Sequence, residues 1–168
     1  MPAVLFVCTA NQFRSPLAAA CFSNVLERQG LGAEWLVESA GTWTSAGVPA
    51  HPIAQKNAER LGIKGLEFHR SRQVSFDLLD RYDLIVVMES GHKEALVMEF
   101  KPVRQRIYML SEIIEGIQYD IPDPVAPGNH PEDVSTELYS LINQGANKII
   151  SLARALHSAR QIEQQGYS

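Results

Sequence analysis

Cysteine is scarce in this sequence, which has only two, Cys8 and Cys21, among 168 residues. Two cysteines define no disulfide framework, so we expect the chain to work in a reducing setting, the cytoplasm. In such a setting a cysteine with an unusual local context is a candidate nucleophile.

Long hydrophobic runs and an excess of basic residues are also absent. The longest apolar stretches are short and interrupted by charge, so we expect no transmembrane span. The start, Met1-Pro2-Ala3 followed by an apolar run, lacks the basic segment and the cleavage site of a signal peptide. The net charge of −4 predicts no affinity for nucleic acid or for an anionic membrane. An anionic substrate would therefore need a local site that attracts it.

Strand-like apolar segments alternate with helix-like segments along the whole sequence. We predict strands at 4–7, 35–40, 83–88 and 106–110, and helices at 16–29, 53–61, 92–100 and 132–156, with a short one from residue 75. This alternation predicts an α/β protein with a parallel sheet and helices on both of its faces. The length predicts a single domain, residues 1–168, while the order of the polar tail after about residue 157 stays open.

A cysteine and an arginine flank a short loop directly after the first strand. The loop runs Cys8-Thr9-Ala10-Asn11-Gln12-Phe13-Arg14, and Ser15-Pro16 follow, with Ser15 as the expected N-cap of a helix. Backbone N–H groups that curl inward at a helix N-terminus form an anion site, and Arg14 adds a planar fork for two phosphate oxygens. The same positive field favours the thiolate of Cys8, which is the nucleophilic form. Ser15 can donate a hydrogen bond to the sulfur, and Asn11 can hold an unusual loop backbone.

A purely structural role is the alternative for these residues. Cys8 would then be a small buried side chain at the end of a strand, and Arg14 a solvated charge at a helix start. A chance Cys-x5-Arg-[Ser/Thr] has odds of roughly one in a hundred here, and the required strand before it and helix after it lower them further. The sequence therefore favours an oxyanion site around Cys8.

The same residues resemble the opening of the low-molecular-weight protein tyrosine phosphatase family, an apolar strand followed by Cys-x-[Gly/Ala]-Asn-x-Cys-Arg-Ser-Pro. Four later segments match the family in the same order: Ser39-Ala40-Gly41-Thr42, His69-Arg70-Ser71-Arg72-Gln73, Val87-Met88-Glu89 and Asp120-Ile121-Pro122-Asp123-Pro124. The resemblance thus covers most of the chain. It implies the family's fold, a small doubly wound, flavodoxin-like sheet of four parallel strands.

The resemblance implies catalytic roles for three residues: Cys8 as nucleophile, Arg14 as phosphate ligand and Asp123 as general acid. Asp123 also has a physical basis, because cleavage of a phosphate ester needs a proton for the departing oxygen and then a base for water. An ordinary surface turn is the alternative for Asp123, and Asp120 is the competing acid. The family's acid directly precedes a proline, which favours Asp123.

The rest of the loop is expected to bind the substrate, through Thr9, Ala10, Asn11, Gln12, Phe13 and Ser15. In the family the equivalents of Ser39 and His69 form hydrogen bonds around the loop asparagine, although His69 could also be an ordinary surface histidine. No cluster of histidine, cysteine and aspartate has the spacing of metal ligands, so we expect neither a metal nor a cofactor.

Three positions differ from many tyrosine-specific relatives. Val125 follows Asp123-Pro124 where those relatives have a tyrosine that stacks on phosphotyrosine, and Gln12 replaces an apolar residue at the pocket mouth. Phe13 replaces a second cysteine, so Cys8 lacks a partner within the loop for a reversible disulfide. Trp43, in the loop after the second strand, either stacks at the pocket rim or packs in the core.

The favoured function is hydrolysis of phosphate from phosphoprotein, with phosphotyrosine as substrate, through a phosphocysteine intermediate. One alternative is a protein-arginine phosphatase of the same fold, because a polar Gln12 suits a guanidinium group. The other is a catalytically inactive protein that binds a phosphorylated ligand. We expect the protein to act as a monomer or weak dimer on a phosphorylated protein or peptide, with inorganic phosphate as product.

Overall fold

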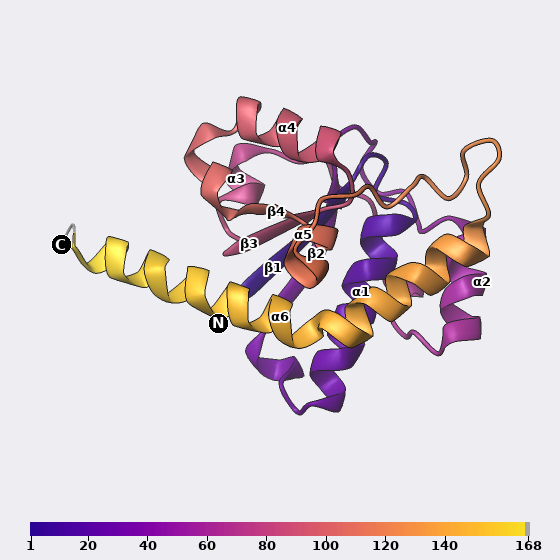
Figure 1. Cartoon of the computed structure of the whole chain (residues 1–168), viewed down its shortest axis with the longest axis horizontal. Coiled ribbons are helices and arrows are strands. Elements are labelled where there is room, and N and C mark those ends of the chain that lie inside the picture. Colours follow the sequence, from indigo (N-terminus) through magenta and orange to yellow (C-terminus); the bar gives the residue numbers. More distant parts are fainter. Residues whose placement is uncertain (167–168) are drawn as a thin grey trace.

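The computed structural model describes residues 1–166, and its centre is a sheet of four parallel strands in the order β2-β1-β3-β4. The strands are β1 (Ala3–Cys8), β2 (Leu36–Gly41), β3 (Leu84–Val87) and β4 (Ile107–Met109). The predicted doubly wound sheet of four parallel strands is confirmed (Figure 1).

Helices cover both faces of this sheet (Figure 1). One face carries α1 (Arg14–Arg28), α2 (Pro52–Leu61), α5 (Leu110–Glu115) and α6 (Pro131–Gly166). The other face carries α3 (Phe76–Leu79) and α4 (Ser90–Glu99). Short 3₁₀ turns lie at Gly32–Glu34, Leu66–Phe68 and Lys101–Arg106. The α-helices and strands follow one another along the chain in the predicted order, except that α5 was not predicted.

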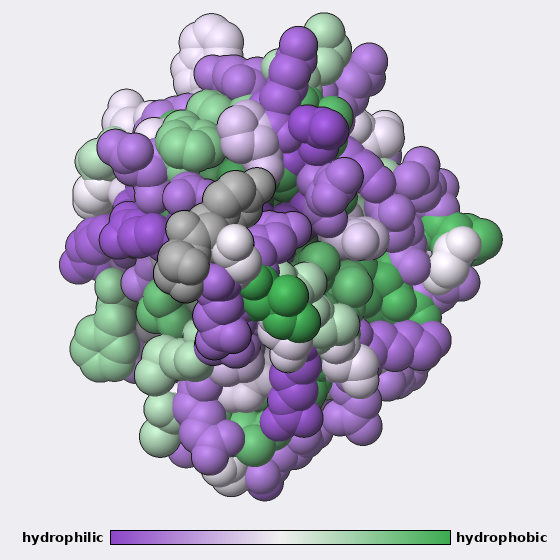
Figure 2. Space-filling view, turned by 90° about the vertical axis from the view of Figure 1, so that its left-hand side faces the viewer, coloured by the Kyte–Doolittle hydropathy of each residue, from purple (hydrophilic) through white to green (hydrophobic). Residues whose placement is uncertain are grey.

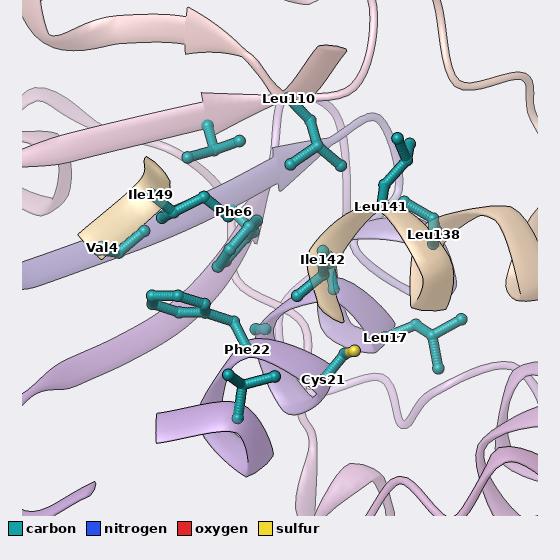
Figure 3. Close-up of a cluster of buried hydrophobic side chains, with 14 of the residues drawn as sticks. Val4, Phe6, Leu17, Cys21, Phe22, Leu110, Leu138, Leu141, Ile142 and Ile149 are labelled. Atoms are coloured by element: carbon teal, nitrogen blue, oxygen red, sulfur yellow. The ribbon is translucent and has the colours of Figure 1, made fainter. Parts of the chain in front are cut away.

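The strand β1 is buried on both faces, as its continuous apolar run predicts. Val4, Phe6 and Cys8 belong to the core beneath α1 and α6, where the Phe6 ring lies edge-on to Phe22 with centroids 5.8 Å apart (Figure 3). The intervening residues of β1 belong to the core beneath α3 and α4. Parallel strands end at the same edge of a sheet, so the end of β1 places Cys8 among the loops that follow the neighbouring strands.

Among the helix starts, those of α1 and α5 depart from the prediction in an informative way, while α4 begins at Ser90 instead of residue 92. α1 begins at Arg14, and Ser15 is not its N-cap because the Ser15 hydroxyl contacts other groups. The apolar run at 106–110 was predicted as one strand, but Leu110 already begins α5. The carboxylate of Glu112 accepts the Met109 N–H at 2.9 Å. That bond satisfies one of the backbone donors that a helix start leaves unpaired.

The last helix, α6, extends ten residues past its predicted end at Leu156 and reaches Gly166. Its extension contains alanine, arginine, glutamine and glutamate, which favour helix without an apolar face. Asp83 anchors it, with His157 Nδ1 at 3.0 Å and Arg160 Nη1 at 2.9 Å from the carboxylate. The tail whose order was left open is thus helical through residue 166, and residues 167–168 lie outside the described part.

The free end of α6 projects past the body of the protein (Figure 1). Hydrophilic residues cover much of the face from which it projects (Figure 2). Within residues 1–166 no helix combines the length and the apolar character needed to cross a membrane.

Candidate active site

Cys8 lies at the base of the loop formed by residues 8–14, called the phosphate loop below, and is only 3% exposed. Its Sγ is 2.9 Å from the Ser15 Oγ. That oxygen accepts a hydrogen bond from Asn11 Nδ2 at 2.8 Å, and its only other acceptor contact is a longer one, 3.4 Å to the Ala40 carbonyl. Either atom of the Cys8–Ser15 pair can donate; when Cys8 is a thiolate, the Ser15 hydroxyl is the donor and stabilises the negative charge.

Asn11 shapes the phosphate loop. Its φ of 56° is the single positive value of a non-glycine residue within residues 1–166, and asparagine tolerates this left-handed conformation better than most residues. Its Nδ2 donates to Ser15 and also to Ser39 Oγ at 2.9 Å, while its Oδ1 accepts the Arg72 N–H at 2.9 Å. The bends of the loop are thus held by bonds to segments elsewhere in the chain.

His69 supports the same residue from the other side. Its Nε2 lies 2.6 Å from the Asn11 carbonyl oxygen, so the expected contacts of Ser39 and His69 with the loop asparagine are both present. Burial lowers the pKa of His69 below its usual value, with the charges of Arg72 and Arg70 adding to the effect and the Asn11 carbonyl opposing it. A neutral His69 donates its Nε2 proton to that carbonyl.

The phosphate loop ends at the N-terminus of α1, with Phe13 as the residue that precedes the helix. The Phe13 side chain is buried, and its ring lies 5.8 Å from that of His51. The Phe13 side chain belongs to the core, because a large apolar ring gains more by burial than by lining an anion site. Asn11 and Ser15 are buried as well, and their side chains are bonded to each other.

Arg14 is buried and makes two polar contacts through the same nitrogen. Its Nη1 donates to the Ile121 carbonyl at 2.8 Å and lies 3.1 Å from Glu89 Oε2. The guanidinium carries further N–H donors on its other nitrogens, which have no partner within the described residues. Arg14 is therefore oriented by the protein while part of its fork stays available for an oxyanion.

Two aspartates of the segment 120–125, called the acid loop below (orange in Figure 1), have different surroundings. Asp120 Oδ1 accepts the Ser90 N–H at 2.8 Å and so caps α4. Asp123 is exposed, and its Oδ1 accepts only the local Val125 N–H at 3.0 Å. Ile121 N–H donates to the Met88 carbonyl at 2.9 Å, which anchors the base of the loop. The Asp120 carboxylate thus contacts the start of α4, whereas the Asp123 carboxylate accepts a hydrogen bond from within its own loop.

Glu89 and His92 lie in the site but received no role from the sequence. Glu89 lies two residues beyond the end of β3, and His92 lies in the first turn of α4; because Val87 of β3 is paired with Val7 of β1, both are at the sheet edge that carries Cys8. His92 Nε2 lies 2.8 Å from Thr9 Oγ1 and 3.2 Å from Glu89 Oε2. The position of Glu89 at the end of a buried strand was the signal that could have identified this pair.

The rim of the site combines polar and apolar side chains. Trp43 is 85% exposed, which excludes the core position, and its N–H donates to the Thr9 carbonyl at 3.0 Å. Val125 is 50% exposed on the acid loop. Thr9 and Ala10 are exposed, and Gln12 is half-buried with its carbonyl held by the His51 N–H.

Within residues 1–166 no group of three or more histidine, cysteine, aspartate or glutamate side chains is arranged to hold a metal ion. The ionisable residues described in this site include Cys8, Arg14, Glu89 and Asp123.

Comparison with known proteins gives matches along nearly the whole chain. The family described as low molecular weight phosphotyrosine protein phosphatase matches residues 3–164. A protein-arginine-phosphatase of Geobacillus stearothermophilus is 34% identical over 147 residues, covering 87% of this chain and 95% of the relative. The low molecular weight protein-tyrosine-phosphatase YfkJ of Bacillus subtilis is 32% identical over 155 residues, covering 90% and 95%.

A solved structure shows the same arrangement of the chain. It is a mutant of the YwlE arginine phosphatase with a serine in place of a cysteine and a phosphorylated active-site serine. It superposes with a TM-score of 0.79 at 31% identity, covering 88% of this chain and 95% of that one.

Proposed function

Because the chain belongs to the low molecular weight phosphotyrosine protein phosphatase family, we propose that it hydrolyses phosphate from protein side chains through a phosphocysteine intermediate on Cys8. The observation that supports this most strongly is the Ser15 hydroxyl, 2.9 Å from the Cys8 sulfur at the N-terminus of α1. A protein that only binds phosphate has no use for a stabilised thiolate.

In the first step the Cys8 thiolate attacks phosphorus, an S–P bond forms and the bond to the substrate oxygen breaks. Asp123 gives its proton to the departing oxygen. The loop N–H groups and the free part of the Arg14 fork hold the three equatorial phosphate oxygens, whose charge is spread in the transition state. The dipole of α1 adds positive potential at the same place.

In the second step a water molecule attacks phosphorus while Asp123, now a carboxylate, takes a proton from that water. The S–P bond breaks, and inorganic phosphate is released. The leaving group is the Cys8 thiolate, which the Ser15 hydroxyl stabilises as it departs. The chain's own residues supply every charge and proton in both steps, so we propose turnover without a metal or a cofactor.

Substitution of Cys8 and of the two aspartates tests this function in the presence of a metal chelator. We expect turnover of an aryl phosphate to vanish in Cys8→Ser and to slow by roughly a hundredfold or more in Asp123→Asn. Asp120→Asn is the matched control: its amide oxygen can still accept the Ser90 N–H, so its activity should stay within about threefold of wild type. Full activity in Cys8→Ser, or no turnover by the wild-type protein, would contradict the proposal.

Phosphoarginine is the second candidate substrate. Gln12 places an amide at the pocket mouth, Val125 takes the place of a stacking tyrosine, and one relative at 34% identity is a protein-arginine-phosphatase. The amide oxygen of Gln12 could accept a guanidinium N–H, whereas an aryl ring gains from an apolar wall. Gln12→Leu should therefore raise the ratio of phosphotyrosine to phosphoarginine hydrolysis, by about tenfold if the amide makes one such bond. An unchanged ratio for matched peptides would remove Gln12 as the determinant.

We further propose a cytoplasmic location, since both cysteines are free and the chemistry requires a reduced Cys8. The partner is a phosphorylated protein or peptide, and neither nucleic acid nor a membrane is expected as one, since the net charge is −4. A monomer or weak dimer suffices, because all proposed site residues lie within one chain.

A further inference from the structure

His92 is a buried histidine on the first turn of α4, and it contacts the phosphate loop without belonging to it. Its Nε2 lies 2.8 Å from Thr9 Oγ1 and 3.2 Å from Glu89 Oε2. The same Glu89 oxygen lies 3.1 Å from Arg14 Nη1. One imidazole nitrogen therefore reaches the residue after the nucleophile directly, and the phosphate-binding arginine through one carboxylate oxygen.

The surroundings of His92 decide which of its nitrogens carries the proton. The other ring nitrogen, Nδ1, is buried and has no hydrogen-bond partner among residues 1–166. A proton on Nδ1 would be a buried donor without an acceptor, which costs more than an unused lone pair on a neutral ring. The proton therefore belongs on Nε2, where Thr9 Oγ1 and Glu89 Oε2 can both accept it.

The neutral form of His92 is also favoured by its burial, although the facing charges act in both directions. Burial lowers the pKa of His92 below its usual value, and Arg14 of α1 acts in the same direction. Glu89 before α4 and Asp120 of the acid loop oppose this effect. At neutral pH the ring is then a donor to Thr9 and Glu89 and not a second cation beside Arg14.

The segment that carries His92 also holds the acid loop. Met88 accepts the Ile121 N–H at 2.9 Å, and the Ser90 N–H donates to Asp120 at 2.8 Å. Arg14, at the end of the phosphate loop, also donates a hydrogen bond to the Ile121 carbonyl of the acid loop. Residues 88–92 are thus the junction between the phosphate loop and the loop of the general acid.

We propose that His92 is a positioning residue of this active site: it holds Thr9 at the pocket mouth and keeps Glu89 in place to orient the Arg14 guanidinium. This proposal rests on the proposed function, since it assigns a role within the same site. Glu89 is 31% exposed, so without His92 its carboxylate is free to turn toward water, and Arg14 loses a fixed partner. A misplaced arginine binds phosphate more weakly in the ground state and in the transition state.

Substitutions at residue 92 separate positioning from packing. His92→Leu fills the space but removes the donor, and we expect it to weaken binding of inorganic phosphate and to lower kcat/KM, each by about tenfold. His92→Gln can place an amide N–H near the position of Nε2, and it should recover most of that loss. His157→Gln is the matched control, since His157 contacts Asp83 and no residue of the site, and it should bind phosphate and turn over substrate like wild type.

A double-mutant cycle tests the link to Thr9. Thr9→Val removes the hydroxyl at an exposed position where folding is not at stake. In His92→Leu the bond between the two residues is already lost, so the double variant should lose no more than His92→Leu alone, within about twofold. Losses that multiply in the double variant would contradict the proposal, as would a His92→Gln protein no better than His92→Leu.

Phosphate binding is measured by calorimetry, which needs no turnover. A wild-type protein that binds phosphate but hydrolyses nothing would refute the proposed function, while the comparison of His92→Leu with wild type would still decide the role of His92. Phosphate affinity within twofold of wild type in His92→Leu would overturn the positioning role even if the enzyme is active.

Discussion

Asn11 joins the phosphate loop to two other parts of the chain. The sequence predicted that an asparagine would hold an unusual backbone in the loop, and φ is 56° at this residue. Its partners could not be predicted from spacing, because Ser39 and His69 are 28 and 58 residues away. Only the resemblance to a family indicated Ser39 and His69, since a single sequence does not show which distant residues a polar side chain will contact.

His69 should make stability depend on pH. Its pKa in the folded protein lies below the usual value, so the unfolded chain binds more protons in the window between the two pKa values. The free energy of unfolding should therefore be highest above a pH of about 6.5, the usual value for histidine, and fall as the pH drops through that window.

The His69→Gln variant isolates this effect, because its amide N–H can still donate to the Asn11 carbonyl and cannot gain a charge. Urea unfolding at a series of pH values should give a smaller decline between pH 7 and 5, values that bracket the usual histidine pKa, for His69→Gln than for wild type. His92 titrates in both proteins and cancels in this comparison. Parallel curves for the two proteins would show that His69 is not held neutral by its surroundings.

At the scale of elements, strands were predicted better than helix ends. The two central strands, β1 and β3, were found because each is a short apolar run that is buried on both faces. The start of α5 was not predicted, because α5 follows β4 directly, with no polar linker to mark the boundary. The end of α6 was predicted too early, because residues 157–166 have no apolar periodicity, which was the signal used to predict helices.

The fate of Ser15 and Phe13 shows how tertiary contacts override local rules. Serine before proline is a typical helix start, yet the Ser15 hydroxyl serves the Cys8 sulfur and α1 begins one residue earlier. Phe13 stands where the phosphate loop of relatives often has cysteine, yet its ring lies in the core beside His51. The loop sequence predicted an anion site, but not that Phe13, Asn11 and Ser15 are buried.

At the scale of the whole molecule, five separate segments meet at the carboxyl edge of the sheet. They are the phosphate loop, the end of β2, residues 69–72, residues 88–92 and the acid loop. Parallel strands bring their ends to one edge, so residues more than a hundred positions apart, such as Arg14 and Ile121, come into contact. The net charge is −4, but this edge concentrates an arginine and a helix N-terminus where an anion is to bind.

The central claim is that phosphate passes through a covalent bond to Cys8, and trapping that bond tests it most directly. Asp123→Asn lacks the base for the second step, so the phosphocysteine should accumulate when this variant is mixed with an activated aryl phosphate, whose leaving group needs little help from an acid. Mass spectrometry after rapid quenching in denaturant at neutral to alkaline pH, where the S–P bond persists, should then find one phosphoryl group on the peptide that contains Cys8. A burst of product without phosphate on Cys8, or with phosphate on another residue, would contradict the account.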